Sequence, residues 1–201
     1  VANSPGVTTY YVYDSQTGAY KSYNGLTHVG TASRFISLGQ SFFTGANIQG
    51  ANLNFKEFMK SSNGTAFERA DVLPQGWVFQ LAKDGFESNL ILTEEIEATA
   101  AFDADQDAFL LKSPEERMHH LYSLATDEAK LTIDVRNDWH VEMIPVYADV
   151  VIPGVYTFEI AQLPTSFNGE WIVNDVLTGA VYDVVAGLVI EAKFDNAFNG
   201  V

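Results

Sequence analysis

The stretch Thr8–Asp14 (TTYYVYD), followed by Ser15-Gln16-Thr17-Gly18 and then by Ala19–Tyr23 (AYKSY), decides the fold class. Both flanking runs are rich in Tyr, Val and Thr and have the residue alternation of β-strands. Gly18 can supply the positive φ that a type I turn followed by a bulge requires. This stretch therefore predicts a β-hairpin.

A similar turn motif, with Asp, Thr and Gly at the same spacing, occurs near the end of the chain. Asp175-Val176-Leu177-Thr178-Gly179 stands between the apolar runs Trp171–Asp175 and Ala180–Val184. In both copies the Asp and Thr side chains are of the type that bonds the loop backbone. The repeat predicts a second hairpin.

Most of the remaining chain has period two, with turn residues about every 8 to 12 positions, as in all-β proteins. One capping box, Ser113-Pro114-Glu115-Glu116, predicts one or two turns of helix before His119. Further strands are predicted at Arg34–Ser37, Gln40–Thr44, Ala51–Phe55, Trp77–Lys83, Asn89–Glu94, Ala108–Lys112, His119–Leu124, Lys130–Val135, His140–Tyr147, Val155–Ile160 and Leu188–Phe194.

The strand pattern restarts after the expected helix, which suggests two units. Residues 114–201 carry about seven strands, the number and spacing of an immunoglobulin-like sandwich. Residues 1–113 carry more and shorter strands, which fit a jelly-roll-like sandwich. We therefore expect an all-β protein with two antiparallel β-sandwich lobes, one over each range. One continuous sandwich is the alternative.

Composition restricts the partners of the chain. Its 201 residues hold 11 Lys and Arg against 26 Asp and Glu, a formal net charge of −15. Such a surface repels phosphate, so nucleic acid and anionic membrane surfaces are poor partners. No apolar run approaches the roughly 20 residues that span a bilayer, so we expect no membrane insertion. Cysteine is absent, which excludes disulfides and thiolate sites. The start at Val1, without a signal-peptide core, indicates a processed or excised segment.

The order of several short motifs resembles a β-rich module of Bacteroidota surface and secreted proteins, found just upstream of the C-terminal sorting domain of type IX secretion. The motifs are Tyr11-Val12-Tyr13-Asp14 with Thr17-Gly18, Tyr20 and Tyr23; Phe35-Ile36-Ser37-Leu38-Gly39-Gln40-Ser41-Phe42-Phe43; Ala98-Thr99 with Phe102-Asp103 and Asp107-Ala108; Leu121-Tyr122-Ser123; Leu131-Thr132-Ile133; and Gly154-Val155-Tyr156-Thr157-Phe158.

The resemblance implies an extracellular or cell-surface location and a module without assigned catalysis. The chain departs from the family pattern at three points. Ser41 replaces a glycine, the upstream "GNPY" segment is missing, and the chain stops before the "RF" strand and has no sorting domain. Either this is a trimmed piece, or another chain completes its edge strands.

The segment Asp103-Ala104-Asp105-Gln106-Asp107 is a candidate calcium loop. Alternating carboxylates converge on a hard cation when the backbone turns around it. Residues 84–107 contain eight acidic side chains and no basic one, so a cation would relieve repulsion. Asp103, Asp105 and Asp107 are therefore candidate ligands of a structural calcium ion. A solvated acidic loop is the alternative, and no cofactor is required.

Two other groups of residues carry site hypotheses. Asp138, His140 and Glu142 alternate with apolar residues, so on a strand they would share one face and have the chemistry of a zinc or acid/base site. A solvated outer face is the alternative. Tyr11, Tyr13, Tyr20 and Tyr23 crowd the first hairpin, where exposed rings would stack on sugars. A half-buried cross-strand cluster is the alternative.

The sequence has no G-x-S-x-G elbow, H-E-x-x-H helix, P-loop or dinucleotide fingerprint, and we predict that the protein is not an enzyme. The leading hypothesis is a non-catalytic extracellular module for adhesion, spacing or assembly of a secreted bacterial protein. Its partners would be other domains of that protein or like subunits. The alternatives are a carbohydrate-binding module that takes polysaccharide, and a subunit of an extracellular polymer assembled by strand exchange.

Overall fold

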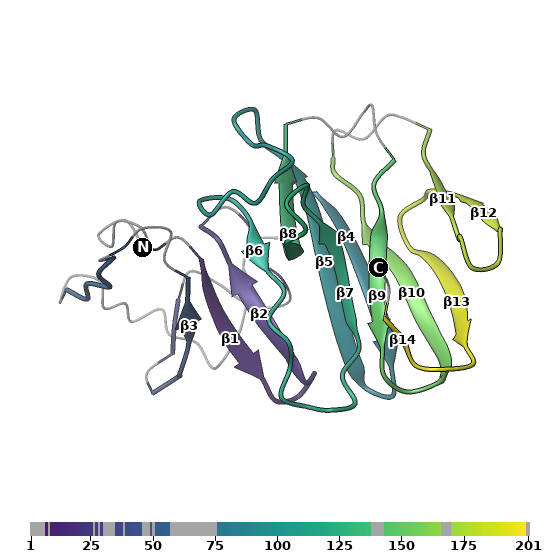
Figure 1. Cartoon of the computed structure of the whole chain (residues 1–201), viewed down its shortest axis with the longest axis horizontal. Coiled ribbons are helices and arrows are strands. Elements are labelled where there is room, and N and C mark those ends of the chain that lie inside the picture. Colours follow the sequence, from purple (N-terminus) through teal and green to yellow (C-terminus); the bar gives the residue numbers. More distant parts are fainter. Residues whose placement is uncertain are drawn as a thin grey trace.

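The computed structural model describes residues 7, 9–25, 27, 29, 35–37, 39–45, 49, 51–56, 76–137, 143–165 and 170–199. In this part of the chain the protein is all-β, as predicted, and contains strands but no helix (Figure 1). The strands form one large sheet and two small antiparallel sheets. No helix in the described residues is long and apolar enough to cross a membrane.

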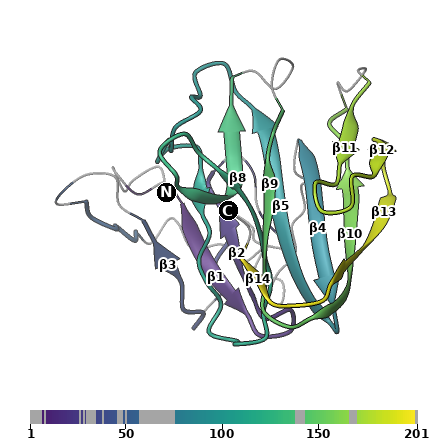
Figure 2. The ribbon, with the colours of Figure 1, turned by 45° about the vertical axis from the view of Figure 1, so that its right-hand side comes forward.

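The large sheet has nine strands in the order β13-β10-β4-β5-β8-β7-β9-β14, with β6 also paired to β8. It curls into a half-barrel (Figure 2). All pairs are antiparallel except β5 with β8, which run parallel. The strands are β4 (Trp77–Lys83), β5 (Phe86–Glu94), β6 (Ala108–Phe109), β7 (His120–Leu124), β8 (Lys130–Arg136), β9 (Val146–Val150), β10 (Gly154–Gln162), β13 (Leu188–Phe194) and β14 (Phe198–Asn199).

A tight hairpin joins β4 to β5. Asp84 and Gly85 both have positive φ, at 51° and 85°, which is the geometry of a two-residue type I′ turn. An Asp-Gly pair adopts it readily because Gly lacks a Cβ and Asp tolerates the left-handed region. The turn sets the register that pairs Trp77 with Leu92 at the far end of the hairpin.

Strand β5 is buried on both faces and separates two cores. Leu90 and Leu92 point into the first core, while Ile91 points into the second. The first core consists of Trp77, Phe79, Leu81, Leu90, Leu92, Leu121, Val150, Tyr156, Ile160 and Phe194. The second core consists of Tyr11, Val29, Ile91, Ala98, Ala108, Ile133 and Val135. Burial of side chains of this size stabilises the fold by about 1.5–3 kcal/mol each.

The two small sheets cover the cores at opposite ends of the long axis (Figure 1). At one end, β1 (Tyr10–Asp14), β2 (Ala19–Tyr23) and β3 (Phe43–Thr44) pair in the order β2-β1-β3, and Tyr11 of β1 enters the second core. At the other end, β11 (Ile172–Asn174) and β12 (Val181–Asp183) form a hairpin. Trp171 and Val173 pack this hairpin on the first core.

The large sheet does not follow the expected arrangement of two antiparallel sandwiches. It takes β4 and β5 from before residue 113 and most of its other strands from after it, and its β5–β8 pair is parallel. The expected helix is a single turn. Ser113 Oγ accepts a hydrogen bond from Glu115 N, and the Met118 amide donates to Glu115 O. The backbone then extends into β7, whose pairing with β9 replaces further helical bonds.

Most predicted strands are confirmed, and a few are shorter or absent. Ala19–Tyr23, Trp77–Lys83 and Leu188–Phe194 are strands with the predicted bounds. Of Gln40–Thr44 only β3 is a strand, and of Ala108–Lys112 only β6. Of His140–Tyr147, residues 140–142 lie outside the described residues, 143–145 are not a strand, and the last two belong to β9. Residues 35–37 and 51–55 are not strands, and β14 was not predicted.

Candidate functional site

The carboxylate of Asp107 lies beneath the acidic loop, where it ties the loop to β8. The side chain is buried, and both of its oxygens accept backbone N–H groups. Val135 N donates to Oδ1 at 2.8 Å, and Asp103 N donates to Oδ2 at 2.7 Å. Thr9 Oγ1 also donates to the Asp107 carbonyl oxygen, which attaches the loop to the start of β1. Asp107 therefore joins three segments of the chain.

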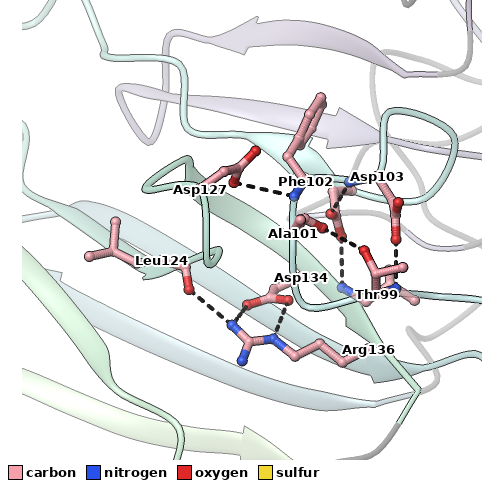
Figure 3. A network of polar contacts seen from close by, with 10 residues as sticks. Thr99, Ala101, Phe102, Asp103, Leu124, Asp127, Asp134 and Arg136 are labelled. Carbon is pink, nitrogen blue, oxygen red and sulfur yellow. Dashed lines mark hydrogen bonds and ion pairs between the residues drawn. The ribbon is translucent and has the colours of Figure 1, made fainter.

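The three predicted calcium ligands have different surroundings. Asp103 Oδ2 accepts the backbone N–H of Thr99 at 2.6 Å (Figure 3). Asp105 is exposed, and Asp107 is buried. Among the described residues, no three His, Cys, Asp or Glu side chains gather in a way that suits a metal ion. Asp103 and Asp107 serve the backbone of the loop in this structure. Calcium ligation by this loop stays a prediction.

Burial raises the pKa of Asp107 to about 7. The negative charges of Asp134 and Asp103 act in the same direction, while the two backbone N–H donors favour the ionised form and oppose it. A carboxyl group with a pKa in this range changes charge near neutral pH. Its charge state therefore affects the stability of the loop and of the second core.

An ion pair on β8 extends this polar network (Figure 3). Arg136 donates two hydrogen bonds to Asp134, from Nε at 3.0 Å and from Nη2 at 2.9 Å. The same Nη2 donates to the carbonyl oxygen of Leu124 at 2.9 Å. Both charged side chains are buried. The fork geometry of the guanidinium suits this arrangement, which holds β8 to the end of β7.

A second buried polar cluster lies on β7, β8 and β9, and the sequence patterns did not predict it. Tyr122 Oη donates to Asp149 Oδ1 at 3.0 Å, and Lys130 Nζ donates to Tyr122 Oη and to Asp149 Oδ2, each at 2.9 Å. Tyr147 stacks on Tyr122 at 5.7 Å between ring centroids. Lys130 on β8 and Asp149 on β9 meet across β7, which lies between them in the sheet, and no sequence pattern showed this strand order.

Two adjacent histidines are buried on opposite faces of the chain near β7. His119 Nε2 lies 2.7 Å from the carbonyl oxygen of Leu81. Burial lowers the pKa of His119, and it lowers the pKa of His120 to about 4, against the opposing effect of Asp149. Both rings therefore stay neutral at neutral pH, which suits a packing role.

The four predicted sugar-stacking tyrosines divide between the two faces of the first hairpin. Tyr11 is buried and its Oη accepts the backbone N–H of Phe109 at 2.9 Å, and burial raises its pKa to about 12. Tyr23 lies on the opposite face of the hairpin, against Tyr10. Tyr13 and Tyr20 contact each other at 5.3 Å between ring centroids.

Phe43 of β3 extends the Tyr13–Tyr20 pair, with its ring centroid 5.7 Å from that of Tyr20. We call Tyr13, Tyr20 and Phe43 the aromatic strip. Phe43 is 58% exposed and Tyr13 is 36% exposed. The half-buried ring of Tyr20 contacts both of them. The sequence pattern of the hairpin had marked Tyr13 as a candidate for sugar stacking. Phe43 comes to lie beside these tyrosines only because β3 pairs with β1.

Exposed aliphatic side chains gather on the β11–β12 hairpin, at the other end of the molecule. We call Ile172, Val176, Leu177 and Val181 the aliphatic tip. Their exposed fractions are 61%, 85%, 57% and 58%. The opposite side of the hairpin is anchored, because Trp171 packs against Trp77 at 5.1 Å between ring centroids. The tip is therefore presented to solvent from a fixed base.

Asp138, His140 and Glu142, the candidate zinc set, lie outside the described residues. Comparison of the chain with protein-family models, with curated proteins and with solved structures finds no match.

Proposed function

We propose that this protein is a non-catalytic module of an extracellular or cell-surface protein and acts in adhesion, spacing or assembly. One observation carries the proposal: the aromatic strip and the aliphatic tip both contain exposed apolar side chains, and the small sheets that carry them lie at opposite ends of the molecule (Figure 1). Two contact surfaces on either side of one large sheet suit a module that holds two partners at a fixed separation.

The buried ionisable groups support this proposal. Asp107 and Asp149 accept hydrogen bonds from other segments of the chain, and Asp134 accepts two from Arg136 on the same strand, so these three side chains have structural partners. The order of motifs that resembles the Bacteroidota surface module supports the extracellular location.

Adhesion can be measured by adsorption to alkylated and hydroxylated sensor surfaces in a quartz crystal microbalance. A variant with Phe43→Ser, Val176→Ser and Leu177→Gln removes apolar groups from both ends. We expect it to adsorb less to the alkylated surface than the wild type, with an unchanged Tm. The matched control is Ile96→Ser with Met143→Ser, because these residues are exposed at 87% and 84% but lie outside both surfaces. Equal losses in the two variants would remove the support for the proposal.

Light scattering of the purified chain, with calcium and with a chelator, separates spacing from assembly. A mass that grows with concentration would indicate self-assembly, as expected of a polymer subunit. A dependence on calcium would implicate Asp103, Asp105 and Asp107 in cation binding. A monomer under both conditions would leave adhesion and spacing.

The aromatic strip favours carbohydrate binding as a second candidate function. Tyr rings stack on the apolar faces of sugars, and Tyr13 carries a hydroxyl for a polar contact. We expect Tyr13→Ala or Phe43→Ala to abolish retention on insoluble polysaccharides that retain the wild type. Phe55→Ala is the control, because Phe55 is 70% exposed but contacts Phe42, outside the strip. Equal retention of all variants would exclude the strip as the binding surface.

A further inference from the structure

The two repeated turns form the same structure. Asp14 and Asp175 both accept a bond from the backbone N–H of the glycine four residues later, at 2.9 and 2.7 Å. In each turn the Asp carboxylate also accepts a hydrogen bond from the Thr hydroxyl and another from the backbone N–H two residues after the Asp. Gly18 and Gly179 have nearly the same φ, 71° and 73°. The Asp, Thr and Gly therefore suffice to build the turn.

The second and third residues of each turn are free to vary, because their side chains take no part in these bonds. The first turn has the polar residues Ser15 and Gln16 at these positions, which suit a turn that faces solvent. The second has Val176 and Leu177, exposed at 85% and 57%. The turn geometry does not require two aliphatic side chains at these positions. Their presence therefore points to a contact made outside the turn.

The apolar surface continues from the turn along the hairpin. Ile172 and Val181 lie on the outer face of β11 and β12, while Val173 on the inner face packs on the first core. In the described part of the chain, β11 and β12 pair only with each other, so each has an open outer edge. An added extended segment could therefore pair with the backbone and cover the tip.

The hairpin that carries the aliphatic tip also carries negative charge. Asp183 is the cross-strand partner of Ile172 and is exposed on the same face, and Glu170, also exposed, stands two residues before Ile172. No Lys or Arg occurs between Arg136 and Lys193. With a formal net charge of −15, a second copy of the chain would be repelled at this surface. Electrostatic complementarity favours a positively charged partner.

We propose that the aliphatic tip docks an extended, basic protein segment in which apolar residues alternate with Lys or Arg. The apolar residues would cover Ile172, Val176, Leu177 and Val181, and the cationic ones would complement the negative net charge of the chain. The inference rests on the proposed function, since it names the chemistry of one partner in assembly. It does not depend on the aromatic strip.

The probe is the synthetic peptide KVKVKVKVK, titrated into the ¹⁵N-labelled full chain at low salt and followed by two-dimensional NMR. We expect saturable shifts confined to the amides of residues 170–193, and weaker binding at higher salt. The peptide EVEVEVEVE is the charge control and should cause no shifts. If neither peptide shifts these amides, or if KVKVKVKVK shifts acidic segments throughout the chain equally, the inference is overturned.

The first turn supplies a matched variant for the second. Val176→Ser with Leu177→Gln installs the residues of the first turn, so the fold is preserved, which a thermal melt confirms. We expect this change to weaken KVKVKVKVK binding by about tenfold or more. Ile96→Ser, at another exposed position, should leave the affinity unchanged. Unchanged binding in the double variant would overturn the inference, while the adsorption experiment tests the proposed function separately.

Discussion

Asp107→Asn should make the stability of the protein rise clearly between pH 5 and pH 8, where the stability of the wild type changes little. The pKa of Asp107 rises from 3.8 to about 7 on folding, so the folded state holds this proton more tightly than the unfolded chain. The stabilisation that results is fully present below the unfolded pKa and is lost as the pH rises to about 7. Linkage gives a loss of about 2.5 kcal/mol between pH 5 and pH 8.

His120 opposes this effect over the same range. Its pKa falls from 6.5 to about 4 on folding, so the stabilisation is present above the unfolded pKa and is lost as the pH falls. Linkage gives a gain of about 2 kcal/mol between pH 5 and pH 8. The pKa of His119 is also lowered, which adds in the same direction. The wild type should therefore show only a weak dependence between these two pH values.

The two effects can be separated by urea unfolding at pH 5 and pH 8, followed by tryptophan fluorescence, to which Trp77 in the first core contributes. We expect Asp107→Asn to be more stable at pH 8 than at pH 5 by about 2 kcal/mol, since only the histidines then contribute. His120→Asn should be less stable at pH 8 than at pH 5, because Asp107 dominates. If Asp107→Asn has the same pH dependence as the wild type, the assignment of this titration to Asp107 is refuted.

Two further changes test the packing of charged and turn residues. Arg136→Met leaves the buried Asp134 without its ion-pair partner and should lower the free energy of unfolding in urea by about 3–5 kcal/mol. Adding Asp134→Leu should recover much of this loss. A loss below about 1 kcal/mol in the single variant would contradict a structural role for the ion pair. Gly179→Ala should cost about 1 kcal/mol for the left-handed φ alone, because its Cβ would meet no atom within 4 Å. Gly18→Ala should cost clearly more, since its Cβ would lie 2.8 Å from Phe86 Cδ1, and equal changes in Tm would contradict the close contact.

The local features of the fold could be predicted from the sequence because they depend on neighbouring residues. The Asp and Gly of each repeated turn, together with the Thr, define its bonds, and both turns form as predicted. The alternation in Trp77–Lys83 gave the bounds of β4 and its buried face. Such features follow from side-chain direction and turn chemistry alone.

The pairing of distant strands could not be predicted in this way. Period two shows which residues share a face, but it does not show that β5 lies beside β8 and parallel to it. The same limit applies to the candidate site. Alternation placed Tyr11 and Tyr13 on one face, but only the packing of that face on the second core buries Tyr11 and leaves Tyr13 exposed. Asp107 is likewise buried by segments distant in sequence.

The strand order of the large sheet has a consequence for the rate of folding. In the large sheet the β4–β5 and β7–β8 pairs form through short turns. In contrast, β10 joins β4 by pairing Glu159 with Gln80, and β8 joins β5 by pairing Ile133 with Ile91. Each of these pairings closes a long loop before it is stabilised by contacts, and folds of this kind fold slowly, in roughly milliseconds to seconds. We therefore expect the β4–β5 hairpin to form early, before the C-terminal strands pair with it. During this interval its edges and the residues of both cores are open to association with other chains.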